Sequence, residues 1–181
     1  MIENCTGARA GTVSFIDGCW RLVYGKLMDW GMNLSLGCVF SGETASVVAA
    51  AKQDDILLLT PSGSADAILD GNDKAFRVCF YDSFQGEAAA QYIADNKMAD
   101  EVSIFYESDY DYSVGLYNSF VAKCQELGIA IKETQTFTTG TNTDFSAQIS
   151  KLTEAGSKVI FLPIYAEEAS TVLTIHRGSM I

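Results

Sequence analysis

Small hydroxyl-bearing and glycine residues follow two apolar segments in the first half of the chain. Residues 62–64 read Ser-Gly-Ser shortly after the apolar segment 56–60, and Ser41 and Gly42 follow the apolar segment 34–40 in a similar way. A turn of this kind before a helix offers hydroxyl groups, backbone N–H groups and the positive end of the helix dipole, which together bind anions such as a carboxylate. If the two apolar segments are neighbouring parallel strands, both turns lie at their carboxyl ends, where open α/β sheets bind small ligands.

The same residues also have a structural interpretation. Ser41 can cap the helix that follows it, and Ser62 and Ser64 are ordinary turn residues. Glu43, in the first turn of the expected helix, competes with an anionic ligand for the same amides or simply compensates the helix dipole. The residues alone leave binding and capping both open.

Two tyrosines occupy comparable places in the second half. Tyr112 begins an expected helix after the polar loop 107–111, and Tyr165 follows the apolar segment 159–162. A tyrosine at the carboxyl end of a strand can cover an apolar ligand side chain with its ring and bond a polar group with its hydroxyl. Alternatively, each is a boundary tyrosine with a buried ring and a solvated hydroxyl.

Short apolar segments alternate with helical patterns along most of the chain. This alternation predicts βαβ units, and strands that are apolar on both faces predict parallel sheets covered by helices on both sides, an α/β fold. The predicted strands are 34–40, 56–60, 76–80, 102–106, 129–137 and 159–162; the predicted helices are 21–31, 43–53, 85–96, 112–127, 144–155 and 166–177, with a short helical turn at 65–69.

Composition excludes several classes of protein. The chain has 181 residues, of which 48% are hydrophobic, and a net charge of -11 without a basic cluster, so no nucleic-acid partner is expected. No apolar segment reaches the length of a membrane span. The five cysteines are widely spaced without a C-x-x-C pair, which favours buried thiols over disulfides or a metal site. Neither a cofactor nor a metal ion is expected.

Five motifs occur in one order at sensible spacing. Together they resemble the substrate-binding proteins of branched-chain amino acid ABC transporters, which belong to the periplasmic binding protein type I superfamily. The resemblance covers about residues 24–174. It rests on residues 58–65 (LLTPSGSA), Phe76-Arg77 with Gln85-Gly86, residues 112–116 (YSVGL), residues 143–146 (TDFS) and residues 161–165 (FLPIY).

The resemblance implies a two-lobed fold that traps an amino acid by closure of the lobes. It matches Ser41, Ser62, Gly63 and Ser64 with lobe-one positions that hold the ligand's carboxylate and ammonium, and Tyr112 and Tyr165 with ligand-contacting positions of lobe two. The partners that it implies are a small amino acid and a membrane permease. The complete protein is expected in the periplasm or lipid-anchored at the cell surface.

The resemblance also divides the chain. Residues 21–78 are expected to form part of lobe one and residues 79–181 part of lobe two, while residues 1–20 stay unassigned. The extended, aromatic-rich segment 74–86 is interpreted either as the crossing between lobes, with residues 80–84 as a candidate hinge strand, or as an ordinary edge strand. No signal peptide is visible at the start, and the chain is expected to be an internal, incomplete piece of the two-lobed fold.

Three other functions remain open. An enzyme is disfavoured because no dinucleotide, phosphate-loop or nucleophile-elbow motif occurs and the chain has one histidine, His176. The ligand-sensing core of a regulator or receptor shares the fold class. The third alternative is a truncated fragment that binds no amino acid with better than millimolar affinity.

Overall fold

The computed structural model describes residues 19–141 and 144–178 and divides them into two compact units. The first unit comprises residues 19–63 and 67–79, and the second comprises residues 64–66 and those from Phe80 onward. Most of the predicted segment 1–20 therefore lies outside the described residues. The boundary between Cys79 and Phe80 falls one residue after the predicted division, and the assignment of the units to lobes stays a prediction.

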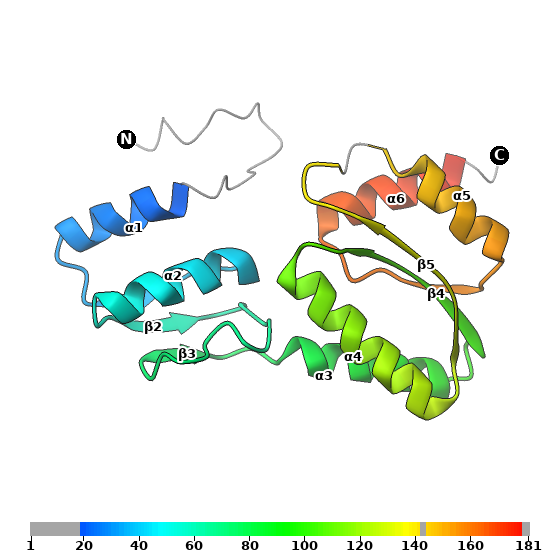
Figure 1. Cartoon of the computed structure of the whole chain (residues 1–181), viewed down its shortest axis with the longest axis horizontal. Helices are drawn as coiled ribbons and strands as arrows, with labels where there is room; N and C mark the ends of the chain where they lie inside the picture. The colour runs from blue at the N-terminus through cyan, green and yellow to red at the C-terminus, as the bar shows by residue number, and fades with distance from the viewer. Residues whose placement is uncertain (1–18, 142–143, 179–181) are drawn as a thin grey trace. The chain divides into compact units, whose positions relative to one another are not determined.

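The first unit is a three-stranded parallel sheet with helices on one side (Figure 1). Its strands pair in the order β1-β2-β3, and its core includes Tyr24 on α1, Val47 on α2 and Leu58 on β2. The elements are α1 (Cys19–Asp29), β1 (Leu34–Leu36), α2 (Ser41–Gln53), β2 (Leu57–Thr60) and β3 (Ala75–Arg77).

The opposite face of this sheet is apolar and exposed. Leu34 pairs with Leu57, and Leu36 pairs with Leu59, so these side chains share one face of the parallel ladder. Leu36 is 71% exposed and Phe76, on β3, is 51% exposed. The expectation of helices on both faces therefore does not hold for the first unit within the residues that the structure describes.

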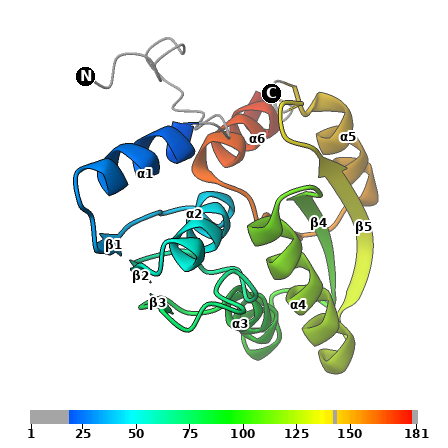
Figure 2. The same ribbon diagram turned by 60° about the vertical axis from the view of Figure 1, so that its left-hand side comes forward.

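The second unit is a parallel sheet between two pairs of helices, with strand order β5-β4-β6. Figure 1 shows α3 and α4 together on one side of β4, and Figure 2 shows β5 next to β4 in a turned view. The elements are α3 (Asp82–Asp95), β4 (Glu101–Glu107), α4 (Asp111–Leu127), β5 (Ala130–Phe137), α5 (Ser146–Ala155), β6 (Val159–Phe161) and α6 (Ala166–Gly178).

The central strand β4 is buried on both faces. Val102 and Ile104 point to a core shared with Phe120 and Cys124 of α4, whereas Phe105 points to a second core with Phe145 beside α5. All six side chains are 0% exposed. The apolar pattern of 102–106 correctly predicted a strand covered on both sides, and the α/β class with parallel sheets is confirmed.

Two sequence predictions of local structure are wrong. The strand at 34–40 ends at Leu36, because Cys38 adopts a left-handed backbone conformation (φ 65°) that no strand contains. The short helical turn predicted at 65–69 corresponds to turns at 66–70, with i to i+3 bonds such as that from Asp70 N to Ala67 O. Residues 80–84 are not a strand, because α3 already begins at Asp82.

Candidate functional site

The two turns of the first unit are joined by hydrogen bonds. Ser62 Oγ donates to the carbonyl of Val39 over 2.6 Å, and Thr60 Oγ1 donates to the carbonyl of Cys38 over 2.9 Å. These bonds link the loop after β2 to the loop after β1, as expected for neighbouring parallel strands. The prediction that both turns lie side by side at the carboxyl ends of β1 and β2 is therefore confirmed.

Ser41 and Gly63 are held close to the body of the first unit. Ser41 is the first residue of α2 and is 1% exposed, while Phe40 occupies the N-cap position without a side-chain capping bond. A Cβ atom on Gly63 would lie 2.7 Å from Thr44 Oγ1, so only glycine allows the turn to approach α2 this closely. The amide of Gly63 donates to Thr60 Oγ1 over 2.9 Å, and its carbonyl accepts from Arg77.

Ser64 belongs to the second unit, although it is adjacent to Gly63. Its carbonyl accepts a hydrogen bond of 3.0 Å from the amide of Asp82, at the start of α3. Asp66 reinforces the connection, because its carboxylate accepts from the amide and the hydroxyl of Ser83. The predicted serine turn is thus divided, with Ser62 fixed to the first unit and Ser64 to the second.

The two predicted tyrosines lie against each other in the second unit. The rings of Tyr112 and Tyr165 stack with centroids 4.8 Å apart and planes 13° apart. Tyr110 meets Tyr165 edge-on, with centroids 5.6 Å apart and planes 81° apart. Both stacked residues are half-buried, and they follow β4 and β6, which are paired strands. The structure therefore brings together these two predicted residues and adds Tyr110 to them.

Carboxylates lie near the end of β4. Glu107 is 8% exposed, and its carboxylate accepts a hydrogen bond of 2.9 Å from Thr139 Oγ1. Burial raises the pKa of Glu107, the bond from Thr139 opposes this, and the nearby charges of Glu168 and Asp109 raise it further. Burial, together with the negative charge of Asp82, also raises the pKa of Tyr112. The Tyr112 hydroxyl is therefore neutral at physiological pH.

The raised pKa of Glu107 predicts a pH-dependent cost of folding. A carboxyl whose pKa is higher in the folded state destabilises the fold as pH rises from the unfolded value, about 4.3, through the folded value. Glu107→Gln keeps the acceptor for Thr139 but carries no charge, so we expect it to raise the free energy of unfolding at pH 7 and to leave it unchanged near pH 4. Urea denaturation of both proteins at the two pH values measures this difference, and a variant less stable than the parent at pH 7 contradicts it.

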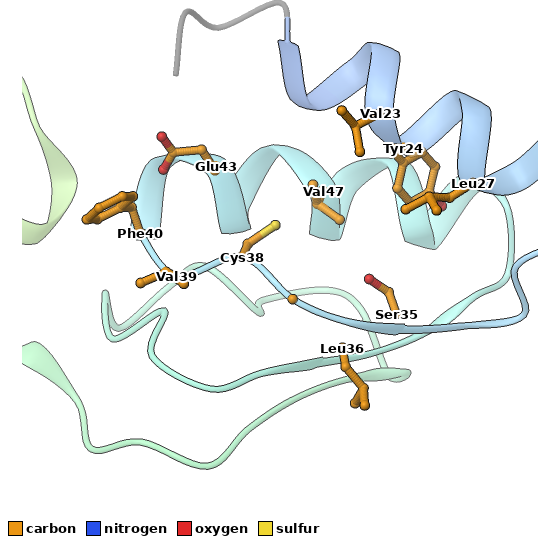
Figure 3. Close-up of a pocket in the computed structure, with 11 residues that line it drawn as sticks. Val23, Tyr24, Leu27, Ser35, Leu36, Cys38, Val39, Phe40, Glu43 and Val47 are labelled. Carbon is orange, nitrogen blue, oxygen red and sulfur yellow. The ribbon is translucent and has the colours of Figure 1, made fainter. Parts of the chain in front are cut away.

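The first unit contains an apolar pocket that the sequence did not reveal. It has a volume of about 370 Å³ and lies between α1, α2 and the segment from Ser35 to Phe40. Figure 3 shows Tyr24 and Leu27 of α1 facing Val47 of α2 across it. The pocket lining includes none of the six predicted site residues. Burial raises the pKa of the Cys38 thiol in this lining to about 11, with Glu43 adding to the effect.

The described residues offer little for metal or redox chemistry. Cys38, Cys79 and Cys124 are free thiols. No three histidine, cysteine or acidic side chains of the described part of the chain come together in a way that could hold a metal ion. Within residues 19–141 and 144–178, no helix has the length and hydropathy needed to cross a bilayer.

A comparison with protein families decides the classification. The model of the family described as periplasmic binding protein matches residues 23–174. This chain belongs to that family. The match spans nearly the same residues as the motif-based resemblance and confirms it, and the chain is a leucine-binding-protein-like member of the type I group.

Individual relatives agree with the family. The chain is 29% identical over 144 residues to the Leu/Ile/Val-binding protein homolog 3 of Brucella melitensis, covering 79% of this chain and 39% of that protein. The crystal structure of a leucine-binding protein from Thermotoga maritima has a TM-score of 0.82 and 29% identity, covering 90% of this chain and 46% of its own. A second crystal structure is that of the branched-chain amino acid transporter substrate-binding protein from Streptococcus pneumoniae in complex with isoleucine. It has a TM-score of 0.81 and 28% identity, and the match covers 91% of this chain and 46% of that protein. The chain thus spans less than half the length of these relatives.

Proposed function

We propose that this chain contributes ligand-binding residues to an extracytoplasmic solute-binding protein of an ABC transporter that captures a branched-chain or similar amino acid. The observation that carries the proposal is the stacked pair Tyr112 and Tyr165, at the carboxyl ends of two paired strands in a member of the periplasmic binding protein family. The isoleucine complex of the pneumococcal relative and the leucine-binding protein of Thermotoga maritima support an apolar amino acid as the ligand class.

The chemistry of such a ligand fits the residues of each unit. An amino acid is a zwitterion, so its carboxylate needs donors, its ammonium needs acceptors and its side chain needs an apolar wall. We propose Ser41, Ser62, Gly63 and Ser64 as the polar residues near the N-termini of α2 and α3. The Ser62 hydroxyl donates to Val39 and the Gly63 amide donates to Thr60, so these two groups must exchange those partners in order to donate to a ligand. The ring pair of Tyr112 and Tyr165 offers the apolar wall. No catalytic step is part of this function, and the ligand is released unchanged.

The proposal includes a place and a partner. Solute-binding proteins of this family act in the periplasm or at the cell surface, and we propose the same location for the protein that contains this chain, with a membrane permease as its partner. Closure of two lobes around the amino acid would retain it until delivery. Because the chain spans less than half the length of its relatives, we expect it to bind weakly by itself.

Ligand-induced stabilisation tests the proposal. With leucine, isoleucine or valine at ~20 mM and a dissociation constant of about 1 mM, the gain in unfolding free energy is about 1.8 kcal/mol and the melting temperature rises by a few degrees. Glutamate at the same concentration serves as the control and is expected to give no shift. The same absence of a shift for leucine, isoleucine and valine would contradict the proposal and favour a fragment that binds no amino acid. A shift with a sugar alone would favour the sensing core of a regulator or receptor.

A further inference from the structure

We infer that Ser113 is a positioning residue that holds the Tyr112–Tyr165 pair in its stacked geometry, an inference that rests on the proposed function of that pair. The Ser113 hydroxyl makes two hydrogen bonds at once. It accepts a bond of 2.8 Å from the amide of Glu107 and donates one of 2.5 Å to the carbonyl of Pro163. The hydroxyl thus joins three separate parts of the second unit: the end of β4, the first turn of α4 and the loop after β6.

The two bonds fix the backbone on both sides of the ring pair. Ser113 directly follows Tyr112, and Pro163 lies two residues before Tyr165, so the bond connects the two tyrosine-bearing segments across 50 positions of sequence. The loop between Pro163 and Tyr165 is further held by the bond from Ile164 N to Leu162 O, and Tyr165 itself accepts a bond from Ala169 in the first turn of α6. The bond from Ser113 to the carbonyl of Pro163 therefore connects α4 to the loop that carries Tyr165, and so fixes the position of Tyr165 relative to α4.

Burial makes the Ser113 hydroxyl hard to replace. Ser113 is 1% exposed, and Pro163 is also buried. Removing the hydroxyl leaves the Pro163 carbonyl and the Glu107 amide without this partner in a site from which water is excluded, and a buried group without a partner is costly. The loop after β6 then relieves that cost by moving toward solvent, which separates the rings of Tyr165 and Tyr112.

Ser113 does not itself touch a ligand in this account, because its hydroxyl is already engaged on both sides. Its effect on binding passes through the tyrosines. A site residue held by a supporting hydrogen bond keeps its geometry before the ligand arrives, and the loss of that support lowers affinity without removing any ligand contact.

The test compares Ser113→Ala with Ser108→Ala. Ser108 also lies at the end of β4 and also donates to a backbone carbonyl, that of Phe137 over 3.1 Å, but it makes no bond to the loop after β6. Ring-to-ring nuclear Overhauser contacts between Tyr112 and Tyr165 are measured without ligand. We expect them to be lost in Ser113→Ala and kept in Ser108→Ala and in the parent. Contacts that persist unchanged in Ser113→Ala overturn the inference.

Two further measurements keep the test decisive. If Ser113→Ala does not fold, Ser113→Thr retains the hydroxyl: a folded variant with the ring contacts supports the inference, and a folded variant without them overturns it. Leucine titration of Ser113→Ala is expected to give an affinity about two- to tenfold weaker than the parent, the range of one hydrogen bond. If the parent binds no leucine but its ring contacts depend on Ser113, the result contradicts the proposed function. If the parent binds leucine but its ring contacts do not depend on Ser113, the result contradicts this inference alone.

Discussion

Gly86→Ala is expected to lower the free energy of unfolding of the second unit by about 3 kcal/mol, the upper part of the range for overpacked cores. Gly86 lies on α3 where that helix crosses α4. A Cβ atom there would lie 2.0 Å from Ser119 Oγ, 2.7 Å from the carbonyl oxygen of Leu116 and 2.8 Å from the amide nitrogen of Phe120. The serine side chain can rotate away, but the two backbone atoms belong to α4, so the helices themselves must separate.

Separation of these helices disturbs the core that they share. Phe120 and Cys124 on α4 pack with Ile93 on α3 and with Ile104 of the central strand β4. Urea denaturation followed by circular dichroism measures the loss of stability. Glu87→Ala is the matched control, since it changes the next, exposed residue of the same helix and is expected to alter stability by less than about 0.5 kcal/mol. A Gly86→Ala variant as stable as this control would contradict the close approach of α3 and α4.

Tyr165→Ala is expected to weaken binding of leucine by about 1–3 kcal/mol, or roughly 5- to 150-fold, as for an aromatic residue at the centre of a binding surface. Tyr165 lies between two other rings, stacked on Tyr112 and edge-on to Tyr110. Its removal therefore deletes its own apolar surface and leaves Tyr112 without the ring that fixes its orientation. The same change in Tyr112 is expected to have an effect of the same sign.

Tyr92→Ala is the control for this comparison. Tyr92 belongs to the same unit, on α3, and is 63% exposed without a place in the tyrosine cluster. Titration of the three variants with leucine, followed by nuclear magnetic resonance because weak affinities are expected, gives the dissociation constants. Equal affinities for Tyr165→Ala and Tyr92→Ala would remove Tyr165 from the site.

The sequence predicted the second unit well because its helices and strands carry strong local patterns. Leu116, Phe120 and Cys124 recur every four residues and are all buried, and Leu127, next on the same apolar stripe, is half-buried, so this pattern indicated the buried face of the predicted helix 112–127. The apolar segment of β4 likewise identified a strand covered on both faces. Such patterns depend only on neighbouring residues and on whether a face is buried.

The first unit shows where this reasoning fails. Leu34 and Leu36 look like residues of a buried strand, yet they are 48% and 71% exposed. An apolar pattern indicates that a face needs covering, but it does not indicate which segment covers it. Cys38 ended the strand early through a backbone conformation that no pattern of apolar residues reveals.

The candidate site was predicted residue by residue, but not its contacts. Tyr112 and Tyr165 were identified singly, whereas the bond that we infer to hold their stacking joins Ser113 and Pro163, which are 50 positions apart. A serine in the first turn of a helix is common enough to pass as a local capping residue. Ser113 was therefore missed.

The most direct test of the account is a leucine titration of the chain with isotope-labelled tyrosine, followed through the ring resonances. The proposed function predicts that the resonances of Tyr112 and Tyr165 shift together with one dissociation constant, while those of Tyr92, on the exposed face of α3, stay in place. Ring resonances of Tyr112 and Tyr165 that do not move at ~20 mM leucine, well above the millimolar affinity expected of a weak site, would contradict amino acid capture by this pair.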